Sequence, residues 1–146
     1  MIRLSMMFLV SRLLMHGQAV QCQDPGPMRG MVWGHDHVVV DMSSKPIKNI
    51  RGMVRALVNQ PVDDTLVEIL QLGPTVSPAE TSNDARVRRR LASCLTGHSG
   101  EFGFDLPPGR YELLLSKPDW NSTSVIVVVS AKGMRRKVVV PLKLAD

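Results

Sequence analysis

Apolar residues alternate with small or polar residues between positions 101 and 115, and this pattern predicts two short β-strands. Phe102, Phe104 and Leu106 occupy every second position of the first strand, so their side chains share one face. The same alternation returns from residue 111 to residue 115. A Pro-Pro-Gly corner at residues 107–109 separates the two strands, because proline cannot donate to a β-ladder. Glycines 97 and 100 bracket a turn before the first strand, so we predict a β-hairpin here.

The rest of the chain shows further strand patterns, separated by residues typical of turns. Residues 125–129 are a continuous β-branched run, which indicates a strand in the middle of a sheet. Pro141 places the closing strand at a sheet edge or bulge. Seven strands counted from Ile50 predict an all-β fold, a seven-stranded antiparallel Greek-key β-sandwich preceded by a signal-like N-terminal helix. The other expected strands cover residues 50–58, 66–72, 86–95 and 137–144.

The N-terminal residues resemble an export signal. Arg3 precedes an apolar stretch, and Gly17-Gln-Ala19 forms a small-x-small cleavage site, so residues 1–19 are expected to be a signal peptide cleaved after Ala19. Arg12 interrupts the apolar stretch, which leaves a tail on a cytosolic protein as the alternative. Residues 20–48 are an irregular lead-in whose valines at 38–40 could form an edge strand. Residues 49–146 form the sandwich, and we expect no stable membrane span in the mature chain.

Composition excludes few functions. The 146 residues carry a formal net charge of +5, and the leader would remove two of the basic residues. This modest excess does not argue for nucleic acid as a partner. The sequence contains no nucleophile motif, phosphate loop or paired-carboxylate signature, and no motif for a cofactor.

Two clusters of side chains are candidates for binding. His35 and His37 would point to one face of a strand and could share a metal, although a solvated segment before the strand is the better interpretation of the two. Arg86, Arg88 and Arg90 would share a strand face able to bind carboxylates or phosphates, and residues 135–137 would extend it if the strands are neighbours. The alternative is a solvated face whose charges oppose aggregation.

Trp120 and the two cysteines complete the candidates. Trp120 could stack on a sugar ring or anchor a partner, or it could close one end of the sandwich. Cys22 and Cys94 could form a disulfide bond in an oxidising compartment. The alternative, which we prefer, is two unpaired cysteines, with Cys94 packed as a small apolar residue.

Several of these residues also carry a family resemblance. Thr96, Gly100 and Phe102, followed by the Leu-Pro-Pro-Gly-x-Tyr-x-Leu element of residues 106–113, resemble the carboxypeptidase regulatory-like domain. The resemblance covers residues 50–144 and is carried mainly by this element. It implies a transthyretin-like (prealbumin-like) sandwich of the kind common in secreted and cell-surface bacterial proteins. Gly97 stands where such domains usually carry an aspartate, which argues against a cation at this turn.

Two functions follow as expectations. The first is a non-catalytic secreted or periplasmic module that binds or spaces, with a glycan, an anionic polymer or an envelope protein as partner and without nucleic acid. On this view the chain is not an enzyme and needs no cofactor. The second is a metal-assisted enzyme or metal-binding protein that uses His35 and His37.

Overall fold

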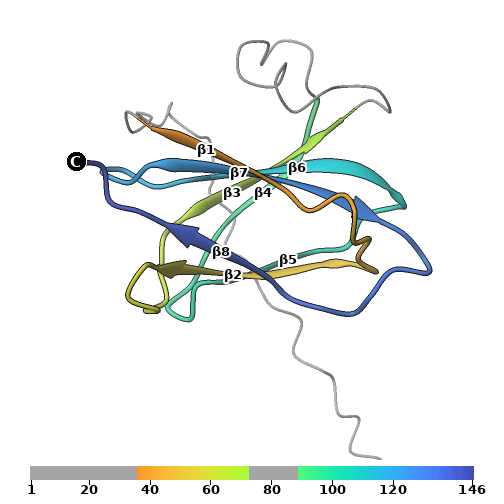
Figure 1. The fold of residues 1–146 in the computed structure, drawn as a ribbon, viewed down its shortest axis with the longest axis horizontal. Coiled ribbons are helices and arrows are strands. Elements are labelled where there is room, and N and C mark those ends of the chain that lie inside the picture. Colours follow the sequence, from red (N-terminus) through yellow and green to blue (C-terminus); the bar gives the residue numbers. More distant parts are fainter. Residues whose placement is uncertain (1–35, 73–88) are drawn as a thin grey trace, which may run out of the picture.

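The structure, a computed structural model, describes residues 36–72 and 89–146 (Figure 1). These residues form strands and contain no helix. The strands are β1 (His37–Asp41), β2 (Ile50–Ala56), β3 (Leu66–Gln71), β4 (Arg89–Leu95), β5 (Glu101–Phe104), β6 (Gly109–Ser116), β7 (Ser122–Val129) and β8 (Val138–Leu142).

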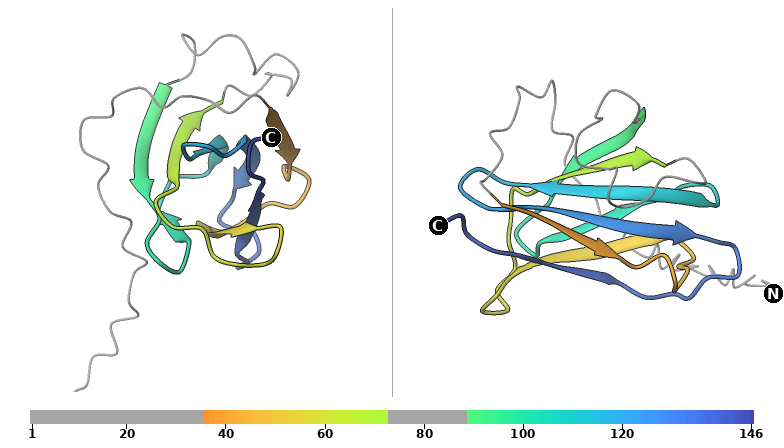
Figure 2. Two further views of the ribbon diagram at one scale, coloured as in Figure 1. Left: turned by 90° about the vertical axis from the view of Figure 1, so that its left-hand side faces the viewer. Right: turned by 45° about the horizontal axis from the view of Figure 1, so that its top comes forward.

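The strands form two sheets that pack face to face, as Figures 1 and 2 show. The five-stranded sheet has the order β1-β7-β6-β3-β4, and the three-stranded sheet has the order β5-β2-β8. The predicted all-β sandwich is therefore confirmed, and β2 to β8 are the seven strands expected from Ile50 onward. Two pairs are parallel, however: β1 with β7, and β2 with β8. The expectation of a purely antiparallel fold is wrong at these pairs, because each joins strands far apart in sequence after crossings between the sheets.

The predicted hairpin is a crossing between the sheets. β4 lies in the five-stranded sheet, whereas β5 pairs with β2, from Ile50 opposite Phe104 to Met53 opposite Glu101. Gly100 has a φ of 69°, and a Cβ on it would lie 2.5 Å from the carbonyl oxygen of Val54. The turn is thus pressed against β2, where the Val54 amide donates to the Gly100 carbonyl at 2.8 Å. The turn residues were identified correctly, but they lead the chain to a different partner.

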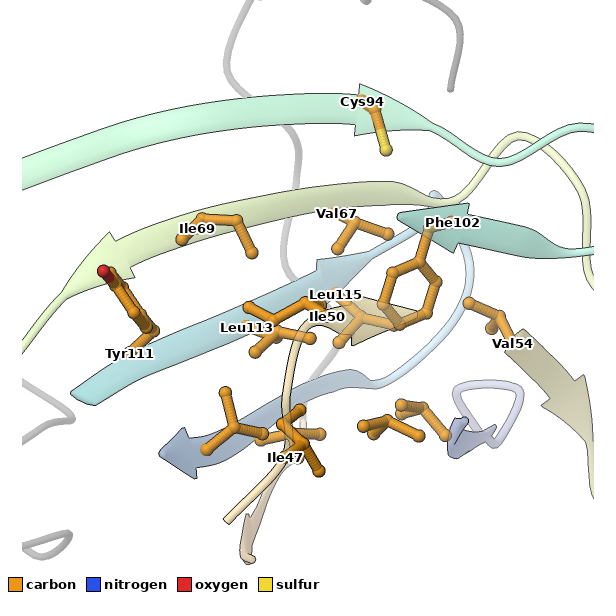
Figure 3. Packing of buried hydrophobic residues seen from close by; sticks show 14 of the residues in the cluster. Ile47, Ile50, Val54, Val67, Ile69, Cys94, Phe102, Tyr111, Leu113 and Leu115 are labelled. Carbon is orange, nitrogen blue, oxygen red and sulfur yellow. The ribbon is translucent and has the colours of Figure 1, made fainter. Parts of the chain in front are cut away.

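The core lies between the sheets and is filled by the alternating apolar residues of both. Phe102 is fully buried among the core residues that Figure 3 shows. Its ring packs on Gly52, where a Cβ would lie 2.1 Å from the ring. Tyr111 is also buried, and its hydroxyl donates to the Pro107 carbonyl at 2.6 Å. This bond holds the Pro-Pro-Gly corner against the strand that follows it. β7 lies between β1 and β6 and is buried along nearly all its length, as its β-branched run predicts.

The expected signal peptide, its cleavage site after Ala19 and the expected N-terminal helix lie outside the described residues. Within residues 36–72 and 89–146, no helix is long and apolar enough to cross a membrane. The valines at 38–40 lie in β1, whose residues are exposed at the edge of the five-stranded sheet.

Candidate functional site: a cationic hollow

Five basic side chains line one open hollow of about 430 Å³ at an end of the three-stranded sheet. We call it the cationic hollow. Its lining residues are Lys48, Asn49, Arg51, Arg135, Arg136 and Lys137. One group precedes or begins β2, and the other group precedes β8. Because β2 and β8 run parallel, both strands begin at the same end of the sheet, and the two basic groups meet there.

Backbone contacts hold the two segments together. The Lys48 amide donates to the Met134 carbonyl, and the Met134 amide donates to the Pro46 carbonyl, both at 3.0 Å. Gly133 permits this approach, since a Cβ on it would lie 2.3 Å from the carbonyl carbon of Ile47. The hollow therefore depends on a close backbone contact between segments that are distant in sequence.

Arg51 lies flat across the outer face of the three-stranded sheet. Its Nη1 donates to the carbonyls of Ile50 at 2.9 Å and Phe104 at 3.1 Å, and its Nη2 lies 2.8 Å from Asp105 Oδ1. A Cβ at Gly103 would lie 3.0 Å from Arg51 Cδ, so the glycine leaves room for this arginine. The guanidinium is thus fixed in place by two carbonyls and one carboxylate.

Lys137 is held by a second carboxylate. Its Nζ donates to Glu101 Oε1 at 2.5 Å. This hydrogen bond, together with the charge of Lys137, lowers the pKa of Glu101. Two cations of the hollow are therefore paired with carboxylates. Lys137 pairs with Glu101 in β5, and Arg51 pairs with Asp105, which directly follows β5.

The other three cations of the hollow differ from Arg51 and Lys137 in their ion pairing. Among the described residues, Lys48, Arg135 and Arg136 form no ion pair with a carboxylate. Arg136 Nη2 makes only a long contact of 3.4 Å with the Lys45 carbonyl. Its Nε is the one buried side-chain nitrogen or oxygen in the described part of the chain that has no hydrogen-bond partner. A buried donor without a partner indicates a position where water or a ligand oxygen is favoured.

Arg90, one of the arginines identified from sequence, lies on the five-stranded sheet and not among the residues of the cationic hollow. Arg86 and Arg88 fall outside the described residues, and Arg90 Nη2 lies 2.6 Å from Glu68 Oε1. Burial raises the pKa of Glu68, and Arg90 offsets part of that rise. β4 belongs to the five-stranded sheet, whereas residues 135–137 precede β8 in the other sheet. The two segments are therefore not on neighbouring strands, so residues 135–137 do not extend a patch around Arg90. They line the hollow with Lys48 and Arg51 instead.

His37 takes part in a chain of hydrogen bonds on the five-stranded sheet. Its Nδ1 lies 2.7 Å from Ser122 Oγ, its Nε2 lies 3.1 Å from Ser124 Oγ, and Ser124 donates to Glu112 at 2.5 Å. Because Ser124 has only one hydroxyl proton, it must accept from Nε2–H, which fixes a proton on that nitrogen. This chain links β1 to β7 and β6.

These contacts bear on the expected metal site. Both ring nitrogens of His37 face serine hydroxyls, so a metal would have to displace one of them. His35 lies outside the described residues. Within the described ranges, no group of three or more potential ligands could hold a metal ion.

Trp120 and Cys94 are both in contact with the sandwich core. Trp120 is half-buried, packs against the core and forms an isolated bridge with Leu144. Cys94 is buried and disulfide-bonded, so the preferred interpretation of an unpaired cysteine is wrong there. The other cysteine of the sequence, Cys22, lies outside the described residues.

Comparisons with known proteins give only structural neighbours. No protein-family model matches the chain, and no curated protein does. Hydroxyquinol 1,2-dioxygenase from Pseudomonas putida DLL-E4 is similar over 88% of this chain and 69% of its own, at 10% identity and a TM-score of 0.41. 3-Chlorocatechol 1,2-dioxygenase from Rhodococcus opacus 1CP is similar over 85% and 71%, at 12% identity and a TM-score of 0.39.

Both neighbours are enzymes, and the prediction that this chain is not an enzyme is not retained. At these identities the likeness concerns the fold alone and assigns no reaction to this chain. The resemblance to the carboxypeptidase regulatory-like domain stays a prediction.

Proposed function

We propose that this chain is a secreted or envelope β-sandwich that binds an anionic polymer through the cationic hollow. One observation carries the proposal: five basic side chains line a single hollow, and three of them have no carboxylate partner among the described residues. Uncompensated cations gathered in a concave surface attract anions more strongly than the same charges spread over a flat one.

The side chains favour ligands with carboxylate, phosphate or sulfate groups. Guanidinium groups donate in a planar fork that matches two oxygens of such a group, and Arg135 and Arg136 supply two of these forks. No aromatic side chain is among the residues that line the hollow, so it offers no platform for stacking nucleic-acid bases. An acidic glycan or another anionic envelope polymer fits this chemistry better than single-stranded nucleic acid.

Export is part of the proposal and rests on two observations. Residues 1–19 have the features of a cleaved signal peptide. Cys94 is disulfide-bonded, and disulfides persist mainly in oxidising compartments. Within one chain, Cys22 is the only cysteine that could be the partner, and cleavage after Ala19 would leave it in the mature protein. Mass spectrometry of the exported protein would test both the new N-terminus and the bond.

Binding is tested by titrating the full mature chain with dextran sulfate, polygalacturonate and polyphosphate in separate calorimetric experiments. We expect the double variant Arg135→Ala/Arg136→Ala to lose about tenfold or more in affinity, since hydrogen bonds to charged groups contribute roughly 1.5–3 kcal/mol each. Lys143→Ala is the matched control, because it removes an exposed cation that lies outside the hollow and pairs with Asp146. Equal losses in the double variant and the control would show binding by overall charge and refute the site. The absence of binding to all three polymers would refute the function.

A further inference from the structure

We infer that Glu101 and Asp105 are built-in competitors for the ligand of the cationic hollow, and that they restrict it to densely charged polymers. The inference rests on the proposed function. It follows from which cations of the hollow are already paired and which are not.

The two carboxylates are positioned to occupy ligand positions. Glu101 lies two residues before Gly103 in β5, so these two positions share the outer face of the sheet, and Asp105 directly follows the end of β5. Gly103 has no side chain to separate the carboxylates from the cations, and Arg51 crosses directly above it. As a result, Asp105 reaches Arg51 at 2.8 Å and Glu101 reaches Lys137 at 2.5 Å. Each carboxylate holds a cation that would otherwise face the hollow.

Both pairs are placed where a ligand could replace them. The Asp105 side chain is 80% exposed, and that of its partner Arg51 is 28% exposed. The Lys137 side chain is more exposed than that of Glu101. Exposed ion pairs contribute little to stability, since water solvates the separated charges well. A ligand anion that displaces one of these carboxylates therefore lowers the stability of the fold only slightly.

This arrangement sets a condition on the ligand. A single anionic group meets Lys48, Arg135 and Arg136, which are unpaired with carboxylates in the described chain. A polymer with closely spaced anionic groups can in addition displace Glu101 and Asp105 and so contact Arg51 and Lys137. Each displacement adds one charged contact, so affinity should rise steeply with the charge density of the polymer.

The test uses the isosteric variants Glu101→Gln and Asp105→Asn of the full mature chain, with dextran sulfate as the ligand. Each variant frees one cation, so we expect three- to tenfold tighter binding. The slope of log K against log salt should steepen by about one for each freed cation. Asp146→Asn is the matched control, because it breaks the Lys143 pair away from the hollow and should change neither quantity. Inorganic sulfate should bind the variants and the wild type with the same affinity.

The two proposals fail in different ways. If the wild type binds dextran sulfate through Arg135 and Arg136 but the Gln and Asn variants bind equally or more weakly, the carboxylates orient the cations and the competitor inference is wrong. If neither the wild type nor any variant binds, the proposed function is wrong and the inference falls with it. Both proposals are supported if Glu101→Gln and Asp105→Asn bind dextran sulfate more tightly than the wild type does, while Asp146→Asn binds it as the wild type does. Thermal unfolding of each variant, monitored by circular dichroism, shows whether the fold is intact.

Discussion

The substitution Gly133→Ala tests whether one backbone contact supports both the fold and the cationic hollow. A Cβ at this position would lie 2.3 Å from the carbonyl carbon, 2.5 Å from the carbonyl oxygen of Ile47 and 2.8 Å from the Lys48 amide nitrogen. All three are backbone atoms, so no side-chain rotation can relieve the clash. The segments before β2 and β8 must move apart.

The magnitude follows from the contacts that would be disturbed. Overpacking at a buried contact costs about 1–3 kcal/mol. The hydrogen bonds from Lys48 to Met134 and from Met134 to Pro46 contribute roughly 0.5–1.5 kcal/mol each. We therefore expect a loss of about 2–6 kcal/mol in the free energy of unfolding, a large part of the total for a domain of this size. Dextran sulfate binding should weaken as well, because Lys48 and Arg135 would be separated.

Urea unfolding followed by tryptophan fluorescence measures the first effect, and calorimetry at a temperature where the variant is folded measures the second. Gly97→Ala is the matched control, because a Cβ there meets nothing within 4 Å. It should leave the free energy of unfolding within about 1 kcal/mol of the wild type. If Gly133→Ala matched the control in both stability and binding, the close approach would have no energetic role, and this account of the hollow would be wrong.

Three further predictions concern the core, a buried carboxylate and the disulfide. Phe102→Ala removes a fully buried ring and should lower the free energy of unfolding by about 3–5 kcal/mol in urea titrations; a loss below about 1 kcal/mol would contradict its central place in the core. Burial raises the pKa of Glu68 above its ordinary 4.5, so its contribution to stability is present at low pH and lost as pH rises through the raised pKa. The stability of the wild type relative to Glu68→Gln should therefore fall as the pH rises above 4.5, and a constant difference would refute the assignment. Reducing the bond at Cys94 should cost roughly 2–4 kcal/mol, and Cys22→Ser should reproduce this loss without reductant; an unchanged variant would exclude Cys22 as the partner.

The sequence by itself determined which segments are strands. Alternation and turn residues located β2 to β8, the Pro-Pro-Gly corner, and the central and edge positions of β7 and β8. These features depend on neighbours within a few residues, because side-chain direction in a strand has a period of two and turn residues act locally.

Only the tertiary structure decided which strands are partners and therefore where charges meet. The turn at Gly100 joins two sheets, although its residues fit a hairpin equally well. Lys48 and Arg51 are far in sequence from residues 135–137, and the parallel pairing of β2 with β8 brings them into one hollow. Strand pairing is set by the burial of the whole core, so the local sequence pattern of a strand does not predict its partner. The sequence pointed to Arg90 on β4, whereas the fold gathered residues 135–137 with Lys48 and Arg51 beside β2 and β8.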